Sequence, residues 1–133
     1  MKGLISVILP VYNGAQFLSD AIESILTQDF NNFEFIIIND GSTDDSIKII
    51  EHYASVDSRI IAINRENKGL IYTLNEGIKR STGEYIARMD ADDVSIKNRL
   101  QSQYKYMSAN KLDICGGNYI EIDADSKETC HKR

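Results

Sequence analysis

Short apolar runs that alternate with segments of helical periodicity are the feature that most restricts the fold of this chain. A mainly apolar run at 4–9 is followed by apolar residues at helical spacing between 17 and 26, and then by a second run at 33–38. Alternation of this kind is typical of β-α-β units built around a parallel sheet. Only Glu34 interrupts the second run, which indicates a central strand covered on both faces.

The same alternation continues as far as residue 115. Strands are predicted at 4–9, 33–38, 59–63 and 85–89, with a short fifth strand at 113–115. Helices are predicted over 14–28, after a cap at Ser42 or Thr43, over 70–78, and after a cap at Ser95. The third of these helices is indicated by the apolar residues Leu70, Ile71, Leu74 and Ile78. We therefore expect a mostly parallel sheet flanked by helices.

Composition and charge exclude several classes of function. The net charge is −5 and the Lys and Arg residues are scattered, so no basic surface for a phosphate backbone can be drawn, and nucleic acid is not an expected partner. The apolar runs are too short to cross a bilayer, and the N-terminus lacks the apolar core of a signal peptide. We expect a cytoplasmic chain without a transmembrane segment, and we leave open a peripheral association with the membrane.

Polar clusters follow three of the predicted strands. They lie at 10–14, 39–45 and 90–93. In an open parallel sheet, the loops after the strands converge on one crevice, and ligands bind there. These three segments are therefore the predicted functional site.

The most informative cluster holds Asp90, Asp92 and Asp93 within a single short segment. Crowded carboxylates repel one another unless a cation compensates them. Mg²⁺ and Mn²⁺ prefer carboxylate oxygens and accept phosphate oxygens of a substrate at their remaining positions. A metal site for a diphosphate is one interpretation of this cluster. A solvated acidic turn that caps the next helix is the other.

Pro10, Tyr12 and Asp40 follow the first two strands and could contact a base. Pro10 is expected to stop the strand hydrogen bonding, and the Tyr12 ring could stack on a base. The Asp40 carboxylate is expected at the mouth of the crevice, where it can accept a hydrogen bond from a ring N–H. Asn67-Lys68-Gly69 could offer backbone N–H groups and one positive charge to a phosphate. Ordinary turn, cap and loop roles are the alternatives for these residues.

Four segments in order give the chain a resemblance to a known family. They are Ser6–Gly14, Ile38–Asp44, Asn67–Leu70 together with Asn75, and Gly83–Asp93. Across residues 3–117 the chain resembles glycosyltransferase family 2, whose enzymes have the GT-A fold and use nucleotide-diphosphate sugars. The resemblance implies a Rossmann-like GT-A fold of the α/β class, with a mostly parallel sheet in a three-layer α/β/α arrangement. It also implies metal-dependent, inverting transfer of a sugar from a nucleotide-diphosphate donor, commonly a UDP-sugar.

The resemblance further implies roles for individual residues and partners. The nucleotide-binding residues would be Pro10, Tyr12, Asp40, Asn67, Lys68 and Asp92. The metal ligands would be Asp90, Asp92 and Asp93 of the D-x-D signature, and the ion would be Mn²⁺ or Mg²⁺. The partners would be a nucleotide-diphospho-sugar donor and a glycan or lipid-linked acceptor, as in the synthesis of polysaccharides or cell-surface glycans.

The chain is short for this family, so we expect residues 1–118 to be the nucleotide-diphospho-sugar-binding domain of a truncated protein. Residues 119–133 are expected to begin the acceptor part or to form a loose tail. The catalytic base is expected outside the chain, and Glu121, Asp123 and Asp125 are not assigned to it. The alternative function is a nucleotide- or metal-binding module without transferase activity.

Overall fold

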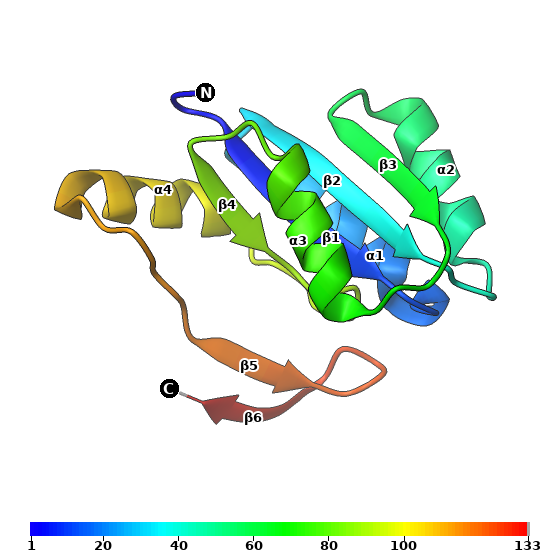
Figure 1. Ribbon diagram of the computed structural model, residues 1–133. Helices are drawn as coiled ribbons and strands as arrows, with labels where there is room; N and C mark the ends of the chain where they lie inside the picture. The colour runs from blue at the N-terminus through cyan, green and yellow to red at the C-terminus, as the bar shows by residue number, and fades with distance from the viewer. Residues whose placement is uncertain (133) are drawn as a thin grey trace. The chain divides into compact units, whose positions relative to one another are not determined.

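The computed structural model describes the backbone of residues 1–132 and the side chains of residues 1–128. Within this part, four parallel strands form a sheet in the order β3-β2-β1-β4 (Figure 1). The strands are β1 (Ile5–Val11), β2 (Phe33–Asp40), β3 (Ile60–Arg65) and β4 (Tyr85–Arg88). The strands are parallel because each connection between them runs back over the sheet, as the alternation of runs predicted.

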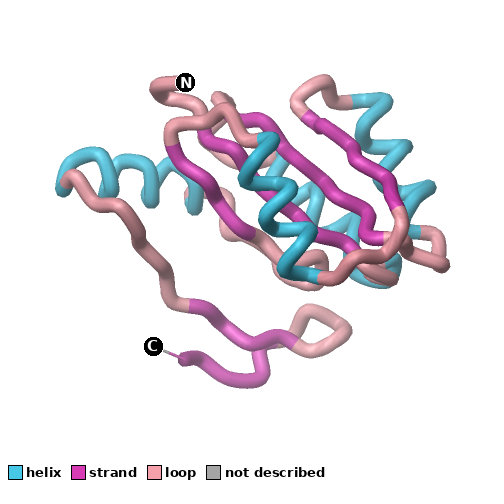
Figure 2. Tube along the Cα trace, viewed as in Figure 1, coloured by secondary structure: helices cyan, strands magenta, loops and turns pink. Residues whose placement is uncertain are grey.

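Helices cover both faces of this sheet. α1 (Ala15–Leu26) and α2 (Ser46–Val56) contact each other on one face, whereas α3 (Leu70–Arg80) packs on β1 and β2 from the other face. Figure 2 shows α3 in front of the sheet and α1 behind it. The predicted three-layer α/β/α arrangement is confirmed.

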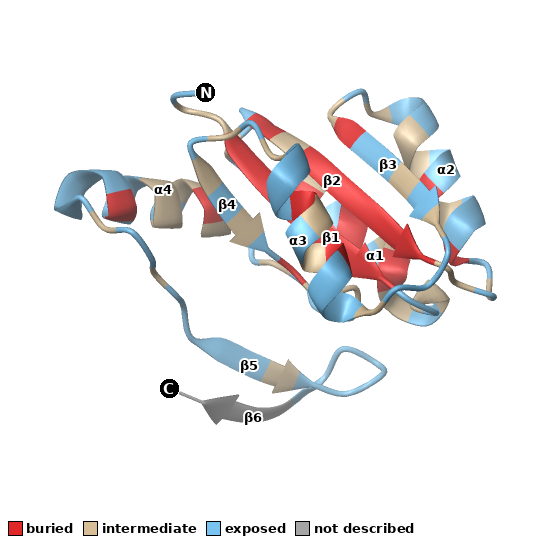
Figure 3. Ribbon diagram, viewed as in Figure 1, coloured by how far each residue is buried: buried red, intermediate tan, exposed pale blue. Residues whose placement is uncertain are grey.

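The core lies around the two central strands. Every residue of β1 is buried, and so is every residue of β2 except Glu34 (Figure 3). On α1, Leu18, Ile22 and Ile25 are fully buried. β3 and β4 lie at the edges of the sheet, and exposed residues occur along both of them. Helices on both faces keep water from the central strands, which is why their sequences are almost entirely apolar.

The α3 helix packs on the sheet through small residues. Its buried positions are Thr73 and Gly77, and a Cβ atom added to Gly77 would lie 2.7 Å from the Ile8 Cγ2 atom. Apolar residues indicated this helix in the sequence, yet Ile71 is 79% exposed and Ile78 is 52% exposed. The helix therefore approaches β1 closely and leaves much of its apolar surface uncovered.

The remaining elements follow the acidic segment. They are α4 (Arg99–Asn110) and a hairpin of β5 (Tyr119–Ile122) and β6 (Glu128–Lys132), paired antiparallel. The predicted cap at Ser95 is wrong, because α4 begins at Arg99 and the Ser95 Oγ atom accepts the Arg99 Nη1 group (3.1 Å). The predicted strand at 113–115 is also wrong, since β5 begins at Tyr119.

The chain divides into two compact units, residues 1–102 and residues 103 onward, and the boundary lies within α4. The hairpin occupies part of the segment for which the sequence predicted either the start of an acceptor part or a loose tail. The predicted domain boundary after residue 118 stays a prediction. Among the described residues, no helix combines the length and the apolar character needed to cross a membrane.

Candidate functional site

The predicted site lies at the carboxyl end of the sheet, where β1 extends beyond β4. The last pair of the two strands joins Ile8 to Arg88, so residues 9–11 lack a neighbouring strand on that side within the described sheet. The Ile8 carbonyl accepts the Met89 N–H (3.0 Å), and Pro10 directs its nitrogen the same way, because strand residues two apart point alike. β1 continues through Val11 and keeps its pairing with β2, past the predicted end of the strand at residue 9. Pro10 therefore stops the strand hydrogen bonding only on the open side, where the N–H that proline lacks would point.

A pocket of about 450 Å³ opens at this step in the sheet. The structure brings four of the predicted site residues together around it: Pro10, Tyr12, Asp90 and Asp92. Pro10 is buried, whereas Tyr12 is 57% exposed. The Tyr12 ring is therefore accessible for stacking, and two carboxylates border the same space.

The two segments that border the pocket touch each other at Gly14. A Cβ atom added there would lie 3.2 Å from the Ala91 Cβ atom and 3.7 Å from the Val11 Cγ1 atom. Gly14 is also the residue before α1, so the start of this helix is adjacent to the acidic segment. A Cβ atom at Gly14 would therefore be in tight contact with Ala91, which lies between Asp90 and Asp92 in the sequence.

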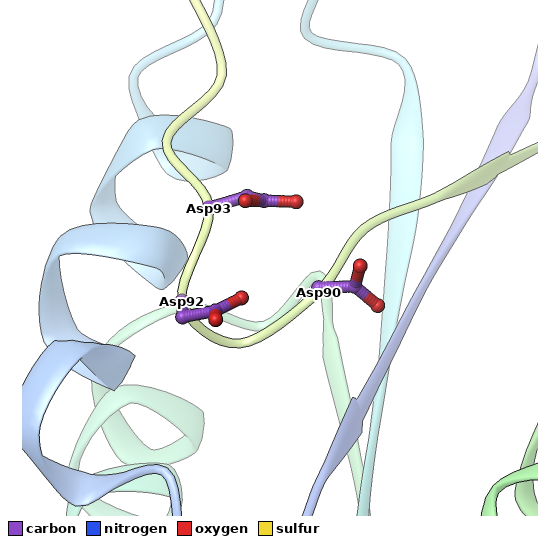
Figure 4. A group of neighbouring side chains, drawn as sticks. All are labelled: Asp90, Asp92 and Asp93. Carbon is purple, nitrogen blue, oxygen red and sulfur yellow. The ribbon is translucent and has the colours of Figure 1, made fainter. Parts of the chain in front are cut away.

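Asp90, Asp92 and Asp93 form one group of carboxylates, as predicted. Ligand oxygens of all three lie within 4.8 Å of one another. Figure 4 shows the three side chains leaving the loop toward the same side. Oxygens at this spacing from three separate residues fit a hard divalent cation, which takes carboxylate oxygens and leaves positions for other ligands.

The charges around this group are only partly compensated. Arg88 Nη2 lies 3.0 Å from Asp90 Oδ1, and both side chains are about half exposed. Burial, followed by the charges of Asp92 and Asp90, raises the pKa of the Asp93 carboxyl, although Arg99 and Arg88 act in the opposite direction. The group therefore carries excess negative charge that a bound cation would offset.

Asp40 occupies a different environment. The sequence predicted its carboxylate at the mouth of the crevice, but the side chain is only 6% exposed. Its Oδ1 atom accepts hydrogen bonds from Arg65 Nη1 and from the Lys68 N–H (2.8 Å), and its Oδ2 atom accepts the Gly69 N–H (3.0 Å). Burial alone raises the pKa of the Asp40 carboxyl, but these donors outweigh burial and hold the pKa below its ordinary value.

Asn67 and Lys68 lie beside Asp40, and these three residues are not among those that line the pocket. The Asn67 side-chain amide donates to the Asp40 carbonyl (3.0 Å), and the Lys68 ammonium lies 4.7 Å from the centre of the Tyr72 ring. Gly41 allows this close approach. It has a φ of 73°, and a Cβ atom there would lie 2.5 Å from the Asn67 nitrogen.

Asn13 connects the segment after β1 to the segment after β2. Its Oδ1 atom accepts the N–H groups of Thr43 (2.8 Å) and Asp44 (3.3 Å), and its own N–H donates to Ser42 Oγ (2.9 Å). The prediction that Ser42 or Thr43 caps α2 is wrong, because both residues bond to Asn13 and the helix begins at Ser46. These bonds fix the chain immediately next to Tyr12.

Arg65 is the residue at this end of the sheet that the sequence reasoning missed. The predicted third strand ended at residue 63, whereas β3 continues through Arg65, which pairs with Asp40 in the sheet register. A signal was present in the sequence, because Ile61, Ile63 and Arg65 alternate along one face of a strand. Arg65 lies beside Asp40 because the register of β2 and β3 pairs these two residues, and paired residues place their side chains on the same face of the sheet.

The sequence model of a family described as "Glycosyl transferase family 2" matches residues 6–133. The chain belongs to this family. The resemblance drawn from the four sequence segments is therefore confirmed, and the pocket between β1 and the acidic loop lies inside the matched region.

Relatives in the glycosyltransferase family are considerably longer than this chain. An uncharacterized glycosyltransferase of Rickettsia bellii is 42% identical over 123 residues, which cover 92% of this chain and 18% of that protein. Glycosyltransferase GlyG of Streptococcus pneumoniae is 37% identical over 124 residues, which cover 92% of this chain and 41% of that protein. The chain therefore spans less than half the length of these two relatives.

Solved glycosyltransferase structures share the fold. TarS 1-349 of S. aureus in complex with UDP has a TM-score of 0.74 at 27% identity, covering 80% of this chain and 32% of that one. The same protein in complex with UDP-GlcNAc has a TM-score of 0.75 over the same shares. The mannosyltransferase PcManGT from Pyrobaculum calidifontis, in complex with GDP-Man and Mn²⁺, has a TM-score of 0.73 at 24% identity, covering 78% and 32%. Together these similarities confirm the predicted GT-A fold.

Proposed function

We propose that this chain binds a nucleoside-diphosphate sugar at the carboxyl end of its sheet, as the donor side of a glycosyltransferase. The observation that carries the proposal is the pocket lined by Tyr12 together with Asp90 and Asp92. An accessible aromatic ring suits a base, and a group of carboxylates suits a metal-bound diphosphate. The two features line one pocket in a chain that belongs to glycosyltransferase family 2.

The nucleoside end of the donor is assigned to Pro10, Tyr12 and Asp40, with Asn67 and Lys68 as neighbours. The Tyr12 ring would stack on the base, and Asp40 Oδ2, which accepts a single hydrogen bond from Gly69, can accept one more from a ring N–H. Uracil has such an N–H group. The 27% identity to TarS, which has been solved with UDP and with UDP-GlcNAc, supports a uridine donor.

The diphosphate end is assigned to Asp90, Asp92 and Asp93, which would hold Mn²⁺ or Mg²⁺. When bound, the ion neutralises the leaving diphosphate and orients it. The carboxylates supply hard oxygen ligands within 4.8 Å of one another, and Asp92 also lines the pocket that Tyr12 lines. No base is assigned within the chain, and Glu121, Asp123 and Asp125 lie in or next to the β5–β6 hairpin.

The proposed reaction is transfer of the sugar to an acceptor hydroxyl with inversion at the anomeric carbon, as the family resemblance implies. A carboxylate base would deprotonate the acceptor, while the residues described above hold the donor. A glycan or a lipid-linked sugar is the proposed acceptor. The chain would thus contribute donor binding to the synthesis of a polysaccharide or a surface glycan.

The proposal is tested by titrating the chain with UDP in the presence and absence of Mn²⁺, and following the unfolding temperature and the heat of binding. At about 100 times the dissociation constant, UDP should raise the free energy of unfolding by about 2.7 kcal/mol when Mn²⁺ is present. Asp92→Asn should remove most of this gain. The control is Asp113→Asn, which neutralises an exposed acid in the second unit. Equal stabilisation by UDP with and without the metal would contradict the role given to the acidic group.

A further inference from the structure

The Arg65 side chain joins several elements at the nucleoside end of the site. Its Nε atom donates to Glu76 Oε2 (2.8 Å) and its Nη2 atom donates to Thr73 Oγ1 (2.7 Å), both on α3. Its Nη1 atom donates to Asp40 Oδ1 and to the Glu66 carbonyl (3.0 Å). With 13% of its side chain exposed, Arg65 is a part-buried hub, a residue that joins β2, β3 and α3 through its hydrogen bonds.

This hub determines which oxygen of Asp40 is left for a ligand. The Oδ1 atom accepts both Arg65 and the Lys68 N–H, whereas Oδ2 accepts only the Gly69 N–H among the described residues. A carboxylate oxygen accepts about two hydrogen bonds. Oδ1 is therefore fully used inside the protein, and Oδ2 retains one acceptor position.

The same side chain also fixes the loop that carries Lys68 and Gly69. Arg65 holds the start of this loop through the Glu66 carbonyl and its end through Thr73, whose hydroxyl in turn donates to the Gly69 carbonyl (2.8 Å). The planar guanidinium group offers these donors in a fixed arrangement, which an ammonium group cannot reproduce. Most of its N–H groups are thereby committed to the protein and not to a ligand.

We propose that Arg65 is a positioning residue for nucleotide selection: it turns the Asp40 carboxylate so that Oδ2 alone faces the ring N–H of the base. This inference rests on the proposed function, because it concerns the residue assigned there to the base. Arg65 acts through Asp40 and does not contact the nucleotide. A uracil ring donates a hydrogen bond at the relevant nitrogen, whereas the matching nitrogen of cytosine accepts one. Discrimination between UDP and CDP therefore reports directly on the Asp40 orientation.

The test measures the affinities of UDP and CDP by calorimetry, in Mn²⁺, for the wild type and for Arg65→Lys, Asp40→Asn and the double variant. The wild type should prefer UDP. Arg65→Lys should weaken UDP binding about tenfold and leave CDP binding almost unchanged, because a charge-assisted hydrogen bond is misdirected. In the Asp40→Asn background, Arg65→Lys should have no further effect on UDP, since both changes act on one contact.

The matched control is Arg59→Lys, because Arg59 immediately precedes β3 and Arg65 is the last residue of this strand. Arg59 is also part-buried and bonds to Asp57 (2.8 Å), but it lies far from the pocket along β3. It should lower the unfolding temperature without changing the ratio of UDP to CDP affinity. If Arg65→Lys does not fold, Thr73→Val removes one partner of the guanidinium group at nearly constant volume and should lower the UDP affinity about threefold, by part of the energy of one hydrogen bond.

The outcomes separate the inference from the function on which it rests. Unchanged UDP affinity and selectivity in Arg65→Lys, beside weakened binding in Asp40→Asn, would overturn the inference alone. Additive losses in the double variant would also overturn it, because Arg65 would then act independently of Asp40. Absence of UDP binding by the wild type would refute the proposed function and the inference together.

Discussion

Asp40 ends the buried strand β2 and Asp92 follows the edge strand β4, and the surroundings of these two carboxylates differ. Asp92 is exposed beside other acids, whereas Asp40 is buried among Arg65 and two backbone N–H groups. The sequence could predict both as site residues, because polar residues after apolar strands mark the carboxyl end of a sheet. It could not predict the burial of Asp40, since that depends on the register of β2 with β3, which brings Arg65 beside it.

Glu34 is the charged residue that interrupts β2 at the opposite end of the strand from Asp40. Its Oε1 atom accepts the Ser6 hydroxyl (2.5 Å) and the Thr82 N–H (2.7 Å). Burial alone raises the pKa of the Glu34 carboxyl, but the hydrogen bonds from Ser6 and Thr82 outweigh burial and lower the pKa from its ordinary value of 4.5. Ionised Glu34 therefore ties β1 to the turn before β4.

A lowered pKa in the folded state predicts a specific dependence of stability on pH. The contribution of Glu34 is fully present above pH 4.5, the ordinary pKa, and is lost as the pH falls through the lower pKa of the folded state. Glu34→Gln removes this titration, so the stability difference between wild type and variant should shrink as the solution becomes more acidic. Urea unfolding at a series of pH values measures it. Glu51→Gln, on the exposed side of α2, is the control. A constant difference across the series would show that the ionised form has no special role.

At the scale of elements, the order and type of the strands and helices up to α4 could be predicted from the sequence. Apolar periodicity is a local property, and it identified each of these elements. Their ends were less accurate, because contacts distant in the sequence act there: Ser42 bonds to Asn13 ahead of α2, and Ser95 bonds to Ser24 ahead of α4. The packing of α3 through Thr73 and Gly77 could not be predicted from the sequence either, since the apolar residues of the helix indicated a different buried face.

The close contact of Gly77 with β1 leads to a prediction about the stability of a Gly77→Ala variant. Alanine usually favours a helix over glycine by about 1 kcal/mol. In α3, however, the added methyl group would lie 2.7 Å from Ile8 Cγ2, so the helix would have to move off β1. Gly77→Ala should therefore destabilise the fold by about 1–3 kcal/mol, as overpacked cores do.

Chemical denaturation of three variants tests this prediction. Ile8→Ala alone should be destabilising, because it leaves a cavity in the core. The combination of Gly77→Ala with Ile8→Ala should be less destabilising than the sum of the single changes, since the smaller residue makes room for the methyl group. Simple additivity, or an increase in stability for Gly77→Ala alone, would mean that α3 can shift without loss.

At the scale of the whole molecule, every residue assigned to the donor site lies between 10 and 93, within the first compact unit. The second unit includes the β5–β6 hairpin, whose strands pair with each other. An isolated two-stranded hairpin has marginal stability in water. Donor binding is therefore expected to be a property of the first unit.

Ending the chain after Leu112 tests this expectation. The change keeps α4 complete and removes the hairpin. The shortened chain should bind UDP in Mn²⁺ with the affinity of the full chain, and its free energy of unfolding should change by less than about 1 kcal/mol. Calorimetry and urea unfolding give the two quantities. Loss of UDP binding in a chain that still unfolds cooperatively would place part of the donor site in the second unit.

The step between β1 and β4 has a further consequence for how this sheet can grow. If β4 were lengthened toward the pocket, or if a foreign strand aligned there, its next hydrogen bonds would have to come from the stretch around Pro10. Proline has no backbone N–H to donate, so the hydrogen bonding between β1 and such a strand would be interrupted at Pro10. Pro10 thus prevents a further strand from pairing with β1 across the opening of the pocket. Any other residue at position 10 would supply the missing N–H and would allow this pairing.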